Sequence, residues 1–253
     1  MPRSNRSTLL ASILGLAVAG ILAGPAKANV VNLNPTKDNS IYSDLTGNSN
    51  GSGDGVFAGR NSLGGLRRGF LAFDLSSIPA GSLINSVSLT LVLSQSNSGT
   101  AIVSLHRVNA DWGEGTSNGT GQGAPATAGD ATWLRRFFNT TSWTTPGGDF
   151  VATPSASQSV SGLNPYVWSS AGLTSDVQAW RASPSSNFGW ILIGDEGLNN
   201  TAKKFGSRES GTPPVLSVDF TPHAPGAAPA ALGLLSLAMG ALGARLARRR
   251  RPS

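Results

Sequence analysis

The chain has 253 residues, two histidines, no cysteine and a formal net charge of +6 at pH 7. Without cysteine, a disulfide framework and a thiolate metal site are both excluded. Three of the 19 basic residues precede residue 29 and five follow residue 222, so residues 29–222 hold 11 basic residues against all 13 acidic ones. This part therefore carries a net charge of about −2, which excludes the basic face that nucleic-acid binding requires.

The first 28 residues have the order of a secretory signal peptide. A short basic start precedes the apolar run TLLASILGLAVAGILAG, and Ala26 and Ala28 then supply small residues two apart before Asn29. This order is typical of an export signal that is cut after Ala28. We therefore expect a secreted protein whose mature chain begins near Asn29.

Five segments of the mature chain alternate apolar and polar residues. In the clearest, SVSLTLVLS at 86–94, Val87, Leu89, Leu91 and Leu93 alternate with polar side chains. The other four segments are 67–75, 101–108, 188–194 and 214–220. A period of two predicts strands with one buried face.

One helix is expected in LTSDVQAWRASP, residues 173–184. Leu173, Val177 and Trp180 share an apolar face, Thr174 or Ser175 supplies the N-cap, and a proline closes the segment. Short strands with one short helix and no βα alternation predict an all-β fold, an antiparallel β-sandwich. Residues 29–222 are long enough for one such domain.

The C-terminal segment, residues 223–253, combines a linker, an apolar run and five arginines. The apolar run approaches the ~17–25 residues that span a bilayer, and the arginines would stay on the cytoplasmic side. We therefore expect a C-terminal apolar helix that acts as a sorting or membrane-anchoring tail.

A series of motifs runs along nearly the whole mature chain, over about residues 30–221. In order they are KDNSIY, RRGFLAFDLSSIPAGSLINSVSLTL, LHRVNADWGEGTSN, GDATWLRRF, DVQAW, NFGWILIGDE and FGSRES. This series resembles a DNRLRE-domain protein. The resemblance implies a jelly-roll β-sandwich that is similar to carbohydrate-binding modules, some of which recognise acidic polysaccharides, and it implies a structural calcium ion.

The C-terminal tail resembles the PEP-CTERM sorting signal of bacteria that make exopolysaccharide. The match lies in its apolar run followed by arginines, at 225–253. The resemblance implies a C-terminal sorting protease as a partner, transient anchoring in the inner membrane, and a final place at the cell surface or in the extracellular matrix.

The stretch VNADWGEGTSN, residues 108–118, places Asp111 and Glu114 on either side of Trp112. Glycoside hydrolysis needs two carboxylates ~5–9.5 Å apart across a sugar, and two acids on one short loop rarely face each other. We interpret Trp112 as a core aromatic that closes one end of the sandwich. A sugar-stacking platform is the alternative for this ring.

Three acids are candidate calcium ligands, because calcium prefers carboxylate and carbonyl oxygens. They are Asp38, Asp111 and Glu114. The segment Gly47–Gly51 fits G-x-S-x-G, but it lies in a polar loop without the strand and helix that a nucleophile elbow needs. We therefore assign no catalytic residue.

The candidate ligand contacts are Trp133, Arg135 and Arg136 in DATWLRRFF, because the ring can stack on a sugar while the arginines pair with its carboxylate. Among the other aromatics, Trp143, Tyr166 and Trp168 fit either sugar contacts or the core, and Trp180 and Trp190 fit the core. The set Lys203, Lys204, Arg208 and Glu209 is expected to form a solvated strand face with one salt bridge.

These features predict an exported β-sandwich that is not an enzyme and that binds polysaccharide or associates with the exopolysaccharide matrix. A structural or adhesive surface protein without a small ligand accounts for the same features. A polysaccharide-degrading enzyme is the minor alternative. The expected partners are polysaccharide and, through the tail, the membrane.

Overall fold

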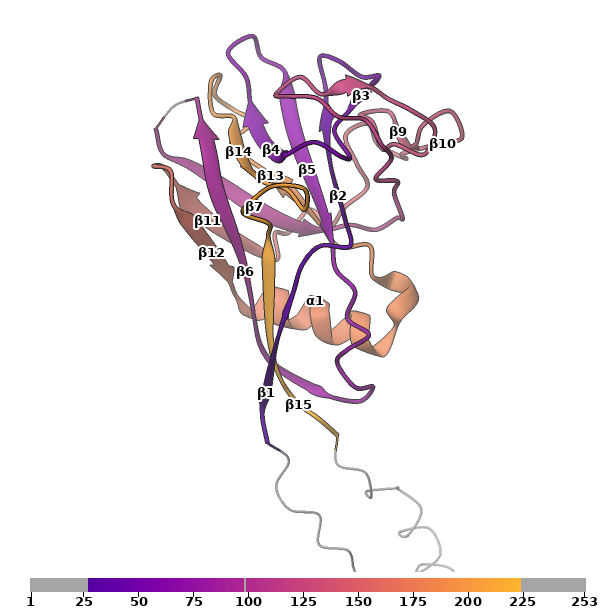
Figure 1. The fold of residues 1–253 in the computed structure, drawn as a ribbon, viewed down its shortest axis with the longest axis vertical. Helices are drawn as coiled ribbons and strands as arrows, with labels where there is room; N and C mark the ends of the chain where they lie inside the picture. The colour runs from indigo at the N-terminus through magenta and orange to yellow at the C-terminus, as the bar shows by residue number, and fades with distance from the viewer. Residues whose placement is uncertain (1–26, 98, 224–253) are drawn as a thin grey trace, which may run out of the picture. The chain divides into compact units, whose positions relative to one another are not determined.

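The computed structural model describes residues 27–97 and 99–223. The described chain is an antiparallel, all-β sandwich with an α-helix, as the alternating segments predict (Figure 1). Most of the predicted signal peptide and nearly all of the predicted tail lie outside the described residues. Among the helices of the described part, none is long and apolar enough to cross a membrane.

The elements follow one another along the chain in this order. The first eight strands are β1 Asn29–Leu33, β2 Lys37–Tyr42, β3 Asn48–Ser49, β4 Gly55–Arg60, β5 Leu66–Ala72, β6 Leu83–Ser96, β7 Ala101–Arg107 and β8 Ala124–Pro125. The others are β9 Arg135–Phe137, β10 Thr141–Ser142, β11 Ala156–Val160, β12 Pro165–Ser169, β13 Trp190–Ile193, β14 Lys203–Gly206 and β15 Val215–Thr221. Helix α1 spans Ala171–Ala182, and the 3-10 turn η1 spans Pro184–Ser186.

Two layers of strands are joined by one hydrogen-bonded path. The long strand β6 pairs with β15 in its first part and with β14 in its last part, and β12 also pairs with it. From β14 the path runs through β4 to β5, and then through β13 and β7 to β11. Strand β2 pairs with β5, and β1 pairs with β15. The sheet therefore passes from one layer to the other through β14 and β4.

The main core lies between the two layers. The four alternating apolar residues of β6, Val87, Leu89, Leu91 and Leu93, are all buried there, which confirms the predicted period. Helix α1 adds Leu173, Val177 and Trp180, its predicted apolar face, and β13 adds Trp190. Burial of such side chains is the main favourable term in folding, at about 25 cal/mol per Å² of apolar surface.

Helix α1 begins earlier than the sequence predicts. Its N-cap is Ser170 rather than Thr174 or Ser175, and the Ser170 hydroxyl accepts a hydrogen bond from the Leu173 N–H at 3.1 Å. The first helical residues, Ala171 and Gly172, contribute little to an apolar period, so the pattern conceals the first turn. The helix ends before the proline, as expected.

A second, smaller core lies on the outer face of β5 and β13. Phe70 and Ile191 point away from the main core and pack with Trp112 and Trp143 from the long connection between β7 and β11. The ring centroids of Trp112 and Trp143 lie 5.1 and 5.5 Å from that of Phe70. Trp112 is 1% exposed, which confirms a core aromatic. It covers a sheet face rather than closing one end of the sandwich, because β5 is apolar on both faces.

Candidate ligand-binding groove

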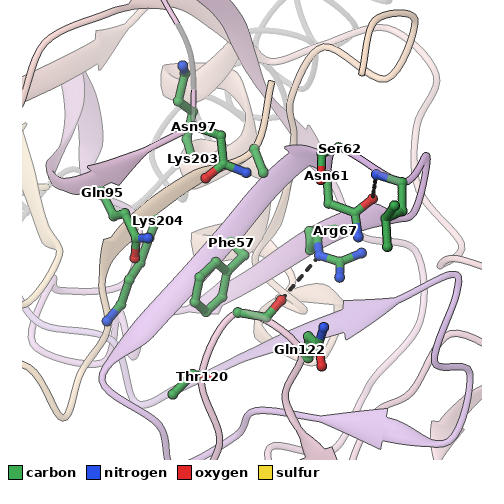
Figure 2. Close-up of a pocket in the computed structure, with 13 residues that line it drawn as sticks. Phe57, Asn61, Ser62, Arg67, Gln95, Asn97, Thr120, Gln122, Lys203 and Lys204 are labelled. Atoms are coloured by element: carbon green, nitrogen blue, oxygen red, sulfur yellow. Dashed lines mark hydrogen bonds between the residues drawn. The ribbon is translucent and has the colours of Figure 1, made fainter. Parts of the chain in front are cut away.

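A groove lies over β4, β5, β6 and β14, with a cavity volume of about 360 Å³. Figure 2 shows the ring of Phe57 at its centre, between Gln95 and Lys204 on one side and Arg67 on the other. The full lining is Phe57, Asn61, Ser62, Leu63, Arg67, Gln95, Asn97, Thr120, Gly121, Gln122, Ala202, Lys203 and Lys204.

Strand register places the floor residues side by side. Lys204 of β14 is opposite Phe57 of β4 on one side and opposite Gln95 of β6 on the other. Val56 precedes Phe57 and belongs to the main core, so Phe57 points to the outer face. The three side chains therefore form a row across the sheet, with the Lys204 ammonium 6.0 Å from the centre of the Phe57 ring.

Gly59 separates the Phe57 end of the floor from Arg67. It is opposite Arg67 in the register and has φ +109°, and a Cβ there would lie 2.9 Å from the carbonyl oxygen of Thr201. The positive φ favours glycine, and the absence of a side chain lets the backbone of Thr201 pack closely against β4.

Arg67 is held in a fixed position at the groove wall. Its guanidinium pairs with Asp44 at 2.7 Å, donates to the Gly121 carbonyl at 3.2 Å, and stacks 5.2 Å from the centre of the Tyr42 ring. The contact with Gly121 also fixes the loop Thr120–Gln122 as the groove rim (Figure 2). A planar, five-donor side chain of this kind suits recognition of a carboxylate.

The lining is basic and rich in amides. Its basic side chains are those of Arg67 and Lys204, whereas Lys203 contributes to the lining but has its side chain buried, and the lining includes no acidic residue. Lys204 pairs with Asp54 at 2.8 Å, and the Asp54 side chain is 68% exposed. The amide side chains of the lining are Asn61, Gln95, Asn97 and Gln122. Amides both donate and accept hydrogen bonds, as hydroxyl groups require.

The prediction of a solvated strand face at β14 is wrong for Lys203. This side chain is fully buried, and its ammonium donates to the Ser96 hydroxyl and to the Gly99 carbonyl, each at 2.7 Å. Burial lowers the pKa of Lys203. The predicted salt bridge does form, with 2.9 Å between the Arg208 guanidinium and Glu209. Lys203 is buried although Lys204 is not, because neighbouring side chains of a strand point to opposite faces.

The predicted ligand contacts lie apart from this groove lining. Trp133 is half-buried against the second core, and the guanidinium of Arg68, not of Arg135 or Arg136, lies over its ring at 4.9 Å. Arg135 donates to the Ser142 hydroxyl at 2.7 Å within the β9–β10 pair, and Arg136 donates to the Asp111 carbonyl at 3.0 Å. The two arginines therefore serve different local contacts.

The three candidate calcium ligands divide into two places. Asp111 pairs with Lys37 at 2.7 Å. Glu114 accepts a hydrogen bond from the backbone N–H of Asp38 at 2.9 Å, which brings these two acids together, and the Arg208 guanidinium lies 2.9 Å from the Glu114 carboxylate. Within residues 27–97 and 99–223, no group of three acids, histidines or cysteines is arranged to hold a metal ion.

Two acids near Arg208, Asp38 and Glu114, have raised pKa values. Burial raises the pKa of Asp38 to about 7, and the charges of Glu209 and Glu114 add to this effect against the hydrogen bond from the Arg208 N–H. Burial also raises the pKa of Glu114, although the Asp38 N–H and the Arg208 charge oppose it. The cluster thus joins β2, the loop that carries Trp112, and the β14–β15 connection.

The other tryptophans named in the sequence analysis, and Tyr166, belong to or pack against the cores. Trp143, Trp168, Trp180 and Trp190 are buried, and Tyr166 packs partly buried against the main core. The sequence gives one signal for the groove, the basic pair in a strand at 203–204. The Phe57 strand is too short and too rich in glycine to be recognised.

No protein-family model matches this chain, and no curated protein matches it.

Proposed function

We propose that the chain is an exported, non-catalytic module that binds a carboxylate-bearing polysaccharide in the groove. The observation that carries this proposal is the groove lining, which combines basic and amide side chains over an aromatic floor and includes no acid. A concave site with a few well-placed polar groups is the usual form of a ligand site. The lining offers charge to a carboxylate and hydrogen bonds to hydroxyl groups.

Lys204 is the side chain that we expect to exchange partners on binding. Its present partner, Asp54, is largely exposed, and exposed ion pairs contribute only ~0–1 kcal/mol. A sugar carboxylate can therefore replace Asp54 at little cost. Arg67 would keep Asp44 and act as a fixed wall. Because the exchanged charges lie near solvent, binding should weaken as salt is added.

The sequence supports the same assignment. The motif series resembles DNRLRE-domain proteins, and through them carbohydrate-binding modules. The N-terminal export signal and the PEP-CTERM-like tail would place the domain at the cell surface, within an exopolysaccharide matrix. We propose that it acts there by binding, with the tail as its means of retention.

Affinity electrophoresis of the purified protein through gels that contain polygalacturonate or neutral dextran tests the proposal. We expect polygalacturonate to retard the parent protein and dextran to have less effect. Lys204→Gln should weaken retardation by about tenfold in affinity, the effect of one lost charge-assisted hydrogen bond. Arg135→Gln on β9 removes the same charge outside the groove lining and should leave retardation unchanged.

Three other outcomes point elsewhere. Loss of retardation in Arg135→Gln, but not in Lys204→Gln, would place the ligand at Trp133, Arg135 and Arg136. Failure of every polymer to retard a folded sample would favour a structural or adhesive surface protein. Shortening of the polymer by the protein would favour a degrading enzyme.

A further inference from the structure

A second cavity lies beside the second core, between the residues that follow β7 and those that precede β11. Its volume is about 600 Å³, within the range of clefts that hold small ligands. The apolar part of its lining is Ala110, Phe150 and Ala152, and the first two of these pack against the second core. The residues that line this cavity and those that line the groove do not overlap, so the two are separate sites.

Backbone pairing joins the two segments that form the cavity. Val108 and Phe150 form an isolated antiparallel bridge. Next to this bridge, the Asn109 N–H donates to the backbone carbonyl of Asp149 at 2.8 Å. The polar side chains of the lining therefore stand on paired backbone, which fixes their positions relative to the apolar residues.

Asp149 brings a carboxylate to this cavity that can still accept hydrogen bonds. One of its oxygens accepts from the Thr144 N–H and the other from the Thr145 N–H, each at 2.9 Å. An ionised carboxylate has about four lone-pair sites, so each oxygen can accept one further hydrogen bond. Both of the existing hydrogen bonds are exposed, and a hydroxyl group from solvent can reach the carboxylate.

Three exposed side chains add donors and acceptors to the lining. The side chains of Asn109, Thr144 and Thr145 are exposed, and none of them has a hydrogen-bond partner among the described residues. An amide and a hydroxyl group can each both donate and accept. Among the described residues that line the cavity, none is basic. The cavity therefore offers hydrogen bonds to hydroxyl groups but no positive charge to an anion.

We propose that this cavity binds a neutral sugar unit. The hydroxyl groups of a sugar both donate and accept, which matches the carboxylate, the amide and the two hydroxyl groups of the lining. The C–H groups of its ring match the apolar residues of the lining. The groove has the opposite charge, with Arg67 and Lys204 and no acid. The two cavities therefore select different ligands, and this inference does not depend on the function proposed for the groove.

An NMR titration of the ¹⁵N-labelled protein tests this site. The probes are the methyl glycosides of glucose, galactose and mannose, which differ in the orientation of their hydroxyl groups. At least one of them should shift the backbone N–H signals of Thr144 and Thr145 to saturation, with a Kd on the order of 1 mM. The signals of Gly121 and Gln122, at the groove rim, should shift less. Sodium glucuronate should have a smaller effect on Thr144 and Thr145, because Asp149 repels its carboxylate.

Variants then separate this cavity from the groove. Asn109→Ala removes an exposed amide and should weaken binding of the glycoside by about fivefold, the effect of one lost hydrogen bond. Thr153→Ala, at an exposed threonine outside the lining, and the groove variant Lys204→Gln should bind the glycoside as the parent does.

Three results would overturn the proposal. They are the absence of a shift at Thr144 and Thr145 with all three glycosides, an equal shift with glucuronate, and unchanged affinity in a folded Asn109→Ala protein. Failure of polygalacturonate to retard the protein would overturn the assignment of the groove alone, because the glycosides carry no charge and are followed at a different site.

Discussion

Asp38 places a carboxyl group in the interior at the start of β2. One of its oxygens accepts a hydrogen bond from the Arg208 N–H at 2.6 Å, and the other, which is buried, has no partner among the described residues. Its pKa is raised by burial from 3.8 to about 7. Because the native state then holds this proton more tightly than the unfolded state, Asp38 reduces the free energy of unfolding as the pH rises from 3.8 to about 7.

Asp38→Asn should therefore stabilise the protein at alkaline pH. The amide keeps an oxygen for the Arg208 N–H and removes the buried charge. We expect a gain of up to roughly 4 kcal/mol above pH 7, from about three pKa units at 1.36 kcal/mol each, that shrinks toward zero as the pH falls to 3.8. Denaturant unfolding of parent and variant at pH 4, 6 and 8 measures it. A gain that does not vary with pH would contradict the assignment.

The variant must be compared with the parent protein at each pH, because Asp44 makes the free energy of unfolding change with pH in the opposite direction to Asp38. Partial burial raises the pKa of Asp44, but the hydrogen bond and charge of Arg67 outweigh this effect and leave the pKa lowered. Its contribution to stability is present above the unfolded-state pKa and is lost as the pH falls through the folded-state pKa. Asp54→Asn, at a largely exposed carboxylate, is the matched control.

Trp112 fills the second core with a large aromatic ring. Its N–H donates to the Phe188 carbonyl at 2.9 Å, and the Lys37 ammonium lies 4.3 Å from the ring centre. Trp112→Ala should reduce the free energy of unfolding by ~3–5 kcal/mol. Leu63→Ala, at a side chain that is 88% exposed, should change it by less than ~0.5 kcal/mol. Similar denaturation midpoints for the two variants would show that the ring is not part of a core.

Helix α1 depends on a cap that its amphipathic pattern conceals. Ser170 caps the N-terminus, and its hydroxyl also donates to the Ser155 carbonyl, which ties the helix to the end of the β7–β11 connection. Ser170→Ala should cost about 1–2 kcal/mol of stability. Thr174→Ala, at the position that the sequence favours as a cap, should cost less than half as much. Thermal unfolding of both variants decides whether Ser170 or Thr174 caps the helix.

At the scale of elements, a strand can be predicted from the sequence where its apolar and polar residues alternate over many positions. Strand β6 is recognisable because one of its faces is buried and the other is polar over many residues. Strand β4, GVFAGR, is not, because it is short, contains two glycines and is buried on both faces. Lys203 and Lys204 show a limit of the same kind. Alternation places them on opposite faces, but the folded structure shows that the face shared by Lys203 and Phe205 is the buried one.

At the scale of the molecule, the sequence predicts the sandwich but not the groove. Phe57, Arg67, Gln95 and Lys204 are up to 147 residues apart in the chain, and they meet only through the register of four strands. No local pattern encodes that register. Carboxylates indicate cation sites, which makes Asp38 and Glu114 candidates from the sequence, but their shared neighbour Arg208 comes from a third element. Such non-local groupings require the folded topology.

The length of β6 has a mechanical consequence. Leu83, at the start of β6, pairs with Thr221 at the end of β15, and Gln95, twelve residues further along, lines the groove. At about 3.4 Å per residue these points lie ~40 Å apart. A pull between a polymer in the groove and the chain beyond β15 would act along the strand axes. Antiparallel hydrogen bonds are perpendicular to the strands, so the ladder between β15 and β6 would bear that force in shear, with its bonds loaded together instead of breaking in succession.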